Sequence, residues 1–175
     1  MPIQTLDRLA DLDASQWDAL LPDAQPFLRH AFLSSLEDSG SVSRHTGWRP
    51  AHGLWHDAEG RLTAAIPAYV KSHSYGEYVF DWGWAEACER AGIRYYPKLL
   101  VGVPFTPVGG ARLLGAGDGL DALLAQLAEQ CDSGRRSSVH VNFTDAVADE
   151  RLAQTGWLER LGCQYHWFNR GYRDF

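Results

Sequence analysis

Apolar and polar positions follow a helical period most clearly in the segment that starts at Asp118. Apolar residues recur there at spacings of three and four: Leu120, Leu123, Leu124, Leu127, Ala128 and Cys131. This spacing places them on one side of a helix. The segment therefore predicts an amphipathic helix whose apolar side packs against the rest of the protein.

Four further helices are predicted from shorter periodic stretches and their end signals. Asp13 or Ser15 can cap the first, Pro26 can open the second, and Asp81 can cap the third. Glycines follow the second, third and fourth helices as stop signals. The predicted helices span residues 13–21, 26–39, 81–92 and 149–162.

Strands are predicted between these helices. Residues 51–71 form a hairpin that turns at Asp57–Gly60, and Pro67 indicates a bulge or an edge position in its second half. The other predicted strands are 2–6, a proline-interrupted buried strand within 95–108, 137–143, and a last strand at 164–172. Helices and strands that alternate in this order indicate an α/β fold, in one domain over residues 1–175.

Composition narrows the class of protein. The chain has 175 residues, 45% hydrophobic and 22% charged, which is enough for one well-packed core. Its formal net charge of -6 disfavours long nucleic acid as a partner. The three cysteines are far apart, so we expect no disulfide framework and no metal site, and a reduced cytoplasmic setting fits. No apolar run approaches the ~20 residues of a membrane span.

Aromatic residues gather between Tyr69 and Phe105, which holds nine of the 21 aromatic residues and both lysines of a chain that has 14 arginines. Tyrosine and tryptophan combine an apolar face with a hydrogen-bonding edge, which suits a groove for a peptide or a sugar. A lysine in it could meet a phosphate or carboxylate, or be an ordinary surface residue. The predicted ligand-binding residues are His73, Tyr75, Tyr78, Tyr95, Tyr96, Lys98 and Thr106.

Glu77 is the candidate catalytic base of this segment. A carboxylate among aromatic rings can have its pKa raised by desolvation, and could then take a proton from an amine that is about to attack. The alternative is a hydrogen-bonded structural glutamate. Asp81, four residues later, is predicted to cap a helix rather than to act chemically.

Arg112, Gly115 and Gly117 form the pattern R-x-x-G-x-G before the amphipathic helix. Free N–H groups and the helix dipole at such a place can hold a diphosphate. The same pattern also suits a glycine-rich structural turn, and the Asp118 carboxylate would compete with a bound anion. Both interpretations stay open.

Two long segments, "SYGEYVFDW" and "YYPKLLVGVPFTP", resemble segments of the GNAT-related proteins of peptidoglycan biosynthesis or recognition, which are relatives of the Fem-type transferases. The resemblance covers nearly the whole chain. It implies a GNAT-like fold, a mixed central sheet flanked by helices, and transfer of an acyl or aminoacyl group to an amine. Members of this family usually have two such domains, so a homodimer or a second domain could complete the site.

The resemblance also bears on the donor. In GNAT enzymes that use acetyl-CoA, an equivalent of the Arg112–Gly117 pattern holds the diphosphate, and a tyrosine protonates the departing thiolate. Leu158 stands at the place of that tyrosine, which favours an aminoacyl-tRNA donor over an acyl-CoA donor. Either would be a substrate rather than a tightly bound cofactor. We therefore expect a transferase acting on an amine of a peptidoglycan-precursor-like acceptor, or a noncatalytic module that binds a muropeptide or another amino-bearing ligand.

Overall fold

A computed structural model describes residues 3–22 and 25–174, and it confirms the predicted α/β class, with a mixed sheet and flanking helices. The helices are α1 (Ala14–Asp18), α2 (His30–Asp38), α3 (Trp82–Arg90), α4 (Asp118–Asp132) and α5 (Ala146–Gln154), with short 3-10 turns at Leu9–Asp11 and Pro26–Leu28. The strands are β1 (Gln4–Leu6), β2 (Trp48–Pro50), β3 (His52–His56), β4 (Leu62–Ile66), β5 (Ala68–Lys71), β6 (Lys98–Val101), β7 (Leu114–Gly115) and β8 (Val139–Val141).

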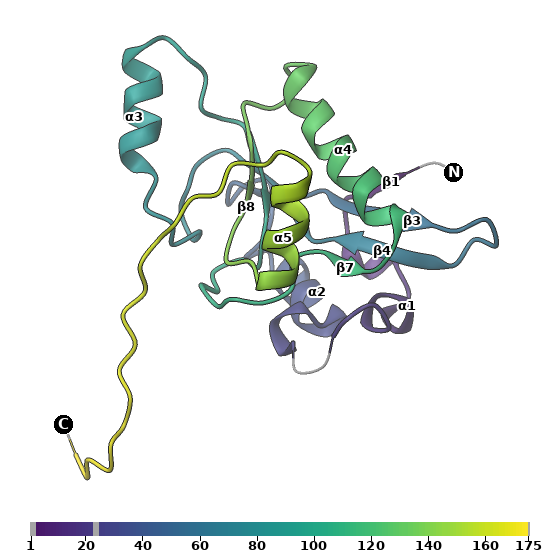
Figure 1. The fold of residues 1–175 in the computed structure, drawn as a ribbon, viewed down its shortest axis with the longest axis horizontal. Coiled ribbons are helices and arrows are strands. Elements are labelled where there is room, and N and C mark those ends of the chain that lie inside the picture. Colours follow the sequence, from purple (N-terminus) through teal and green to yellow (C-terminus); the bar gives the residue numbers. More distant parts are fainter. Residues whose placement is uncertain (1–2, 23–24, 175) are drawn as a thin grey trace.

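The strands form two four-stranded sheets rather than one (Figure 1). The first has the order β1-β3-β4-β7 and is antiparallel throughout. The second has the order β2-β5-β6-β8 and is mixed, because β6 and β8 run parallel. Pro67 lies between β4 and β5, where a residue without an N–H cannot continue a ladder. The chain passes there from the first sheet to the second.

Helix α4 carries much of the core, as its apolar spacing predicts. Its buried residues Leu120, Leu123, Leu124 and Leu127 pack with Ile66 of β4 and with Leu99 and Val101 of β6. Each buried leucine contributes roughly 1.5–3 kcal/mol. A second cluster, which includes Trp17, Leu28 and Leu33, joins the N-terminal helices to Leu54 and Leu114 of the first sheet.

Helix boundaries follow local capping. The Asp13 side chain accepts a hydrogen bond from the Ser15 N–H at 2.7 Å, as predicted, and Asp145 caps α5 through the Ala148 N–H at 2.9 Å. The predicted helix over 26–39 is instead divided, because Arg29 has extended backbone torsions between a 3-10 turn and α2.

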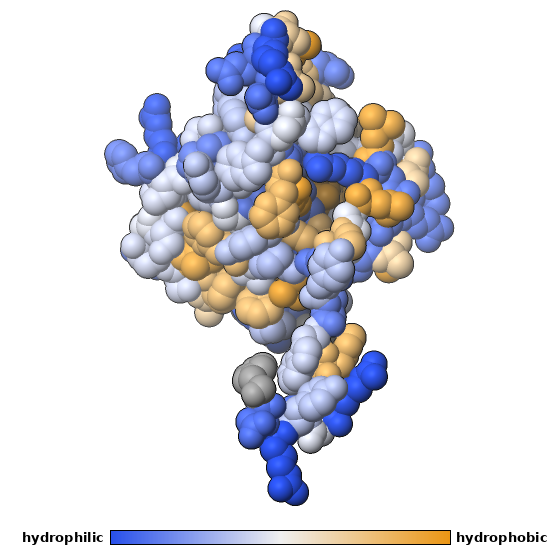
Figure 2. All heavy atoms as spheres, turned by 90° about the vertical axis from the view of Figure 1, so that its left-hand side faces the viewer, coloured by the Kyte–Doolittle hydropathy of each residue, from blue (hydrophilic) through white to orange (hydrophobic). Residues whose placement is uncertain are grey.

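The C-terminal prediction is wrong in two respects. Helix α5 ends at Gln154 instead of continuing to Gly162, because Gly156 turns the backbone to a φ of +82° and the Trp157 N–H bonds back to the Leu152 carbonyl. No strand forms over 164–172 in the described part of the chain. Trp157 still packs against the core, and residues 158–174 form an extended tail that leaves the body (Figures 1 and 2), with Leu158 and Tyr165 almost fully exposed.

Helix α3 stands apart from the other helices at one end of the molecule (Figure 1). It interrupts the connection between the neighbouring strands β5 and β6, so residues 72–81 lead from β5 into α3 and residues 91–97 lead from α3 back to β6. Both segments therefore lie at the same end of the paired strands β5 and β6. Among the described residues, no helix has the length and apolar character needed to cross a membrane.

Two glycines of the R-x-x-G-x-G pattern provide a matched test of backbone strain. Gly115 and Gly117 have φ values of +86° and +81°, but only at Gly115 would an added Cβ clash, 2.1 Å from the Thr63 carbonyl oxygen. We expect Gly117→Ala to cost about 1–3 kcal/mol of unfolding free energy, and Gly115→Ala to cost about 1–3 kcal/mol beyond that. Urea denaturation measures both. Equal losses would contradict the described pairing of β7 with β4.

Candidate functional site

The only two lysines of the chain face each other across the second sheet. Lys71 ends β5, Lys98 begins β6, and the two are direct partners in the strand register. Both side chains are fully buried. Two like charges opposite each other, away from water, destabilise a sheet unless carboxylates neutralise them.

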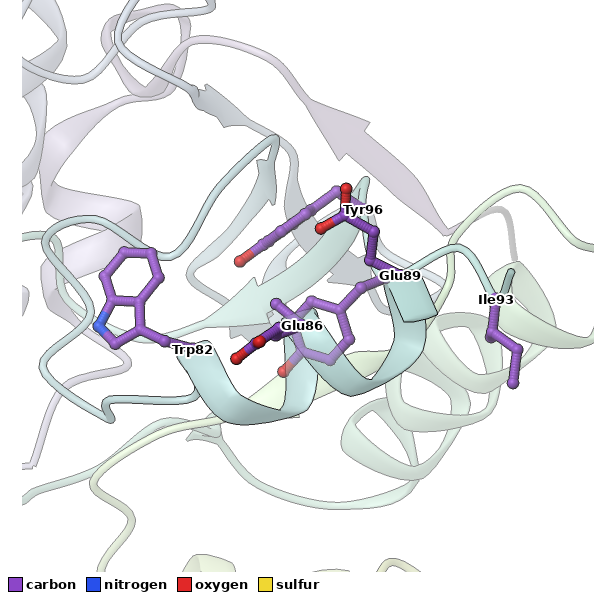
Figure 3. Close-up of a pocket in the computed structure, with 7 residues that line it drawn as sticks. Trp82, Glu86, Glu89, Ile93 and Tyr96 are labelled. Carbon is purple, nitrogen blue, oxygen red and sulfur yellow. The ribbon is translucent and has the colours of Figure 1, made fainter. Parts of the chain in front are cut away.

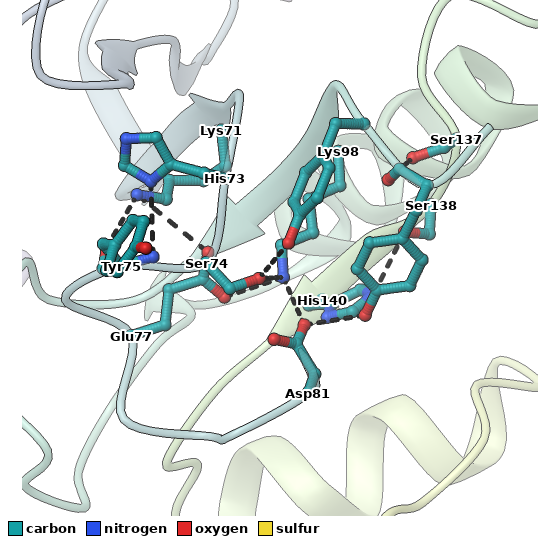
Figure 4. Close-up of polar contacts among 12 residues, drawn as sticks. Lys71, His73, Ser74, Tyr75, Glu77, Asp81, Lys98, Ser137, Ser138 and His140 are labelled. Atoms are coloured by element: carbon teal, nitrogen blue, oxygen red, sulfur yellow. Dashed lines mark hydrogen bonds and ion pairs between the residues drawn. The ribbon is translucent and has the colours of Figure 1, made fainter. Parts of the chain in front are cut away.

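The segment between β5 and α3 supplies those carboxylates (Figure 4). Glu77 places Oε2 2.9 Å from Lys98 Nζ and Oε1 4.0 Å from Lys71 Nζ. Asp81 places Oδ2 2.5 Å from Lys98 Nζ. We call these four residues, Lys71, Glu77, Asp81 and Lys98, the lysine–carboxylate cluster. Two positive and two negative groups leave it formally neutral.

Aromatic and hydroxyl groups complete the contacts of the two ammonium groups. Lys71 Nζ lies 3.4 Å from the centre of the Trp48 ring and donates to the Tyr75 carbonyl at 3.1 Å. Lys98 Nζ donates to Ser74 Oγ at 2.8 Å. Cation–π contacts and hydrogen bonds of this kind partly replace the lost hydration of a buried charge.

Burial sets the pKa values of the cluster in opposite directions. Desolvation lowers the pKa of Lys71 from 10.5 to about 7, although the nearby Glu77 raises it. Desolvation raises the pKa of Glu77, against the attraction of Lys98. For Asp81, desolvation would raise the pKa, but hydrogen bonds from Lys98 and Tyr95 outweigh it and hold the pKa at about 2. Asp81 is thus a fixed anion, while the pKa of Lys71 lies near neutrality and the pKa of Glu77 lies above its ordinary value.

The backbone between the two carboxylates is strained. Tyr78 and Phe80 have φ values of +59° and +51°, in the left-handed region that bulky residues rarely adopt. Each such residue costs about 1–3 kcal/mol and persists only where its surroundings enforce it. These turns bring Glu77 and Asp81 to the same ammonium group, and they leave the rings of Tyr78 and Phe80 exposed.

An open pocket of about 530 Å³ lies next to the cluster (Figure 3). It is formed by one side of α3 and by the segment that leads back to β6; its lining residues are Trp82, Ala85, Glu86, Glu89, Ile93, Tyr95 and Tyr96. Tyr95 donates its hydroxyl to Asp81 Oδ2 at 2.7 Å, and the Tyr96 hydroxyl lies 2.7 Å from Ser74 Oγ. Two residues of the pocket wall thus touch the groups that surround Lys98.

The structure brings together four of the residues proposed from the sequence, Glu77, Tyr95, Tyr96 and Lys98. Glu77 is only 3% exposed, so it does not open directly to solvent. Tyr75 and Tyr78 are exposed, and the Tyr75 ring packs against Trp82 and His73. Thr106 uses its hydroxyl within its own turn, donating to the Pro104 carbonyl at 2.9 Å.

The three residues of the R-x-x-G-x-G pattern do not converge on one open site. Arg112 is buried and donates to the backbone carbonyls of Val108, Ala111 and Asn142. The Gly115 N–H donates to the Leu20 carbonyl at 3.2 Å. Gly117 precedes the first turn of α4, which carries Asp118 and Asp121. A side chain that binds three carbonyls holds the fold and has little capacity left for a phosphate.

The capping role predicted for Asp81 is wrong. It occupies the N-cap position of α3, but its side chain makes no capping hydrogen bond and instead binds Lys98 and Tyr95.

Two residues that surround Lys98, Ser74 and His140, were not predicted from the sequence. Ser74 joins Lys98 to Tyr96, and burial, together with the charge of Lys98, lowers the pKa of His140 to about 4. The use of lysine at two positions only, noted in the sequence, indicated the two cations of the cluster but not their pairing with Glu77 and Asp81.

The profile of the FemAB-like family, described as peptidoglycan biosynthesis/recognition, matches residues 8–175. No curated protein matches the sequence. Similar solved structures include the apo form of the aminoglycoside antibiotic 6'-N-acetyltransferase AAC(6')-IG from Acinetobacter haemolyticus, with a TM-score of 0.49 and 14% identity over 97% of this chain and 99% of that one. A ribosomal-protein-alanine N-acetyltransferase from Brucella melitensis biovar Abortus 2308 gives a TM-score of 0.48 and 14% identity over 95% and 98%.

Removal of one buried cation tests the cluster. Lys98→Met leaves Glu77 and Asp81 buried without their shared partner, and breaking such a pair costs about 3–5 kcal/mol of unfolding free energy. Arg90→Met removes an exposed cation that pairs with Glu86 on α3 and should be indistinguishable from wild type in the same denaturation series. Similar stabilities for both variants would show that Lys98 is not buried among carboxylates.

The pH dependence of stability tests Lys71 separately. Its pKa is about 7 in the folded protein and near its ordinary value of 10.5 after unfolding. Between these values the unfolded chain binds more protons, so stability should rise with pH from about 7 toward about 9, by up to roughly 1.4 kcal/mol per pH unit. Lys71→Met should remove this rise. An unchanged slope in the variant would assign the pH dependence to other groups.

Proposed function

The chain belongs to the FemAB-like family of peptidoglycan biosynthesis/recognition proteins, as its sequence resemblance predicted, and we propose that it is an N-acyl or aminoacyl transferase. Its acceptor is an amine of a peptidoglycan-precursor-like molecule. The acceptor nitrogen attacks the carbonyl carbon of the donor, an N–C bond forms, and the ester or thioester bond breaks. The leaving oxygen or sulfur takes up a proton.

One observation carries the proposal: a carboxylate with a raised pKa lies behind the wall of an open aromatic pocket. An amine is protonated near neutrality and must lose a proton before it can attack. Glu77, with its pKa raised by desolvation, is suited to accept that proton, whereas Asp81, whose pKa is about 2, is not.

Because Glu77 is buried, the proton must reach it through other groups. Tyr96 lies in the pocket wall, its hydroxyl is 2.7 Å from Ser74 Oγ, Ser74 Oγ is 2.8 Å from Lys98 Nζ, and Lys98 Nζ is 2.9 Å from Glu77 Oε2. Lys98 passes a proton to Glu77, and its neutral amine then rotates to accept a proton from Ser74, to which the Lys98 ammonium group donates at rest. Ser74 regains its proton from Tyr96, and Tyr96 from the ammonium group. The acceptor loses one proton and Glu77 gains one.

The donor is an acyl-CoA or an aminoacyl-tRNA, used as a substrate and released. Gly117, at the start of α4, remains the proposed point of contact with a donor diphosphate, whereas the guanidinium of Arg112 is occupied within the fold. We place the reaction in the cytoplasm and assign it to a single GNAT-like domain. A second copy of the chain, or a second domain, could supply the remaining wall of the donor site.

A second candidate function is binding without turnover. The observation that favours it is the burial of Glu77, because a base that never meets its substrate can be a structural ion pair. In that case the chain would recognise a muropeptide or another amino-bearing ligand through the aromatic pocket. Transfer of a labelled group separates the two functions.

We expect labelled acyl or aminoacyl groups to appear on a muropeptide acceptor, and Glu77→Gln to lower kcat by about 10²-fold, since general-base catalysis contributes about that much. Tyr96→Phe keeps the ring and removes the hydroxyl, so it should lower kcat while leaving KM nearly unchanged. Glu59→Gln, at an exposed position, is the control. Absence of transfer from both donor classes, with the muropeptide still bound, would establish the binding function instead.

A further inference from the structure

Positive charge gathers at the C-terminal end of α4. It comes from three segments: β2, the segment that leads from α3 to β6, and the turn between α4 and β8. Hydrogen bonds join the last two segments, because Arg94 donates to the Gly134 carbonyl and the Ser137 N–H donates to the Pro97 carbonyl at 3.0 Å. We call the charged residues of these segments the arginine cluster; they are Arg49, Arg94, Arg135 and Arg136.

Strand register places Arg49 on the face of the second sheet that α4 covers. Arg49 is the partner of Val70, and Val70 is the partner of Leu99. Val70 and Leu99 both pack with the leucines of α4. Because successive side chains of a strand point to opposite faces, Lys71 and Lys98 lie on the other face. The arginine cluster is therefore separate from the lysine–carboxylate cluster.

The arginine cluster holds more positive charge than its surroundings neutralise. Burial lowers the pKa of Arg136, and the charges of the three other arginines lower it further. Within the described part of the chain, Arg135 is the only member that forms an ion pair, with Glu129 at 3.8 Å. Asp132 ends α4 and adds a second carboxylate, and the helix end contributes about half a negative charge. Four guanidinium groups thus face two carboxylates and a partial charge.

The guanidinium groups also have unused hydrogen-bond donors. Arg136 donates from Nη1 to the Arg135 carbonyl at 2.8 Å, while its buried Nε meets no acceptor among the described residues. No hydrogen bond or ion pair ties the Arg49 side chain to another described residue. A guanidinium carries five N–H donors in a planar fork that matches the oxygens of a phosphate. A phosphate dianion would accept from these donors and reduce the repulsion between the arginines.

The arginine cluster is distant from the proposed donor contact. Gly117 precedes α4 at its other end, and the 15 residues of the helix put the two ends about 22 Å apart. A phosphate bound at the arginine cluster is therefore not the donor diphosphate at Gly117. The inference does not rest on the proposed function.

We propose that the arginine cluster is a binding site for a phosphate group with at least two negative charges, either a free anion or part of a larger molecule. The anion lies between the segment 91–97 and the turn 133–137. Ile93 and Tyr95, on either side of Arg94, line the aromatic pocket, so the anion binds next to one wall of that pocket.

Calorimetric titration of the full chain with pyrophosphate, in a buffer without phosphate, tests the site. We expect a Kd below about 1 mM at low ionic strength, and binding at least about threefold weaker in 0.3 M sodium chloride, because salt screens the guanidinium groups. A nucleoside diphosphate then distinguishes the two sources of the phosphate. Binding as tight as that of pyrophosphate indicates a larger molecule, and binding of pyrophosphate alone indicates the free anion.

Paired variants locate the binding. Arg94→Gln with Arg136→Gln should weaken pyrophosphate binding at least about tenfold. Arg170→Gln with Arg173→Gln makes the same change of net charge in the exposed tail and should leave the binding unchanged. Arg94→Gln alone changes an exposed side chain, so its weaker binding can be measured even if the double variant unfolds.

Three results would overturn the inference. The first is no binding of pyrophosphate at millimolar concentration. The second is equal weakening in the two double variants, which would show attraction to the net charge rather than to a site. The third is unchanged binding in Arg94→Gln.

Discussion

The burial of two opposed lysines is the constraint on which the site depends. Lys71 and Lys98 are partners in neighbouring strands and have no access to water, so the fold must bring two carboxylates to them. Glu77 and Asp81 can do this only if the segment after β5 turns sharply, and the left-handed residues Tyr78 and Phe80 make that turn. The strain in the loop, the start of α3 and the shifted pKa values all follow from this one requirement.

The same requirement determines where the pocket lies relative to the cluster. Since Asp81 is both a ligand of Lys98 and the residue that precedes α3, the helix is anchored at its N-terminus next to the cluster and free along its outer side. Tyr95 and Tyr96 close the gap between them, with rings in the pocket and hydroxyls on the cluster. Hydrogen bonds and ion pairs thereby connect a proton acceptor that is protected from water to an open pocket. This arrangement suits the proposed amine chemistry in a chain of the peptidoglycan biosynthesis/recognition family.

Much of the fold could be predicted from the sequence because it is encoded locally. The period of Leu120 to Leu127 and the cap at Asp13 each depend on near neighbours, and both are confirmed. The tail was predicted wrongly because alternation over 164–172 fits a strand only where a partner strand exists. The cluster could be predicted only in part: the rarity of lysine pointed to its members, but the pairing of Asp81 with Lys98 depends on strand register and on a strained loop, which sequence spacing does not reveal.

The ionisation of Lys71 tests the central claim most directly. Because the chain contains only two lysines, a sample labelled with ¹⁵N at lysine Nζ gives only two side-chain nitrogen signals, which a Lys71→Met sample assigns. The account predicts that the Lys71 signal titrates with a midpoint near pH 7 in the folded protein. A Lys71 midpoint at the ordinary value of about 10.4 for a solvated lysine would contradict a buried cluster.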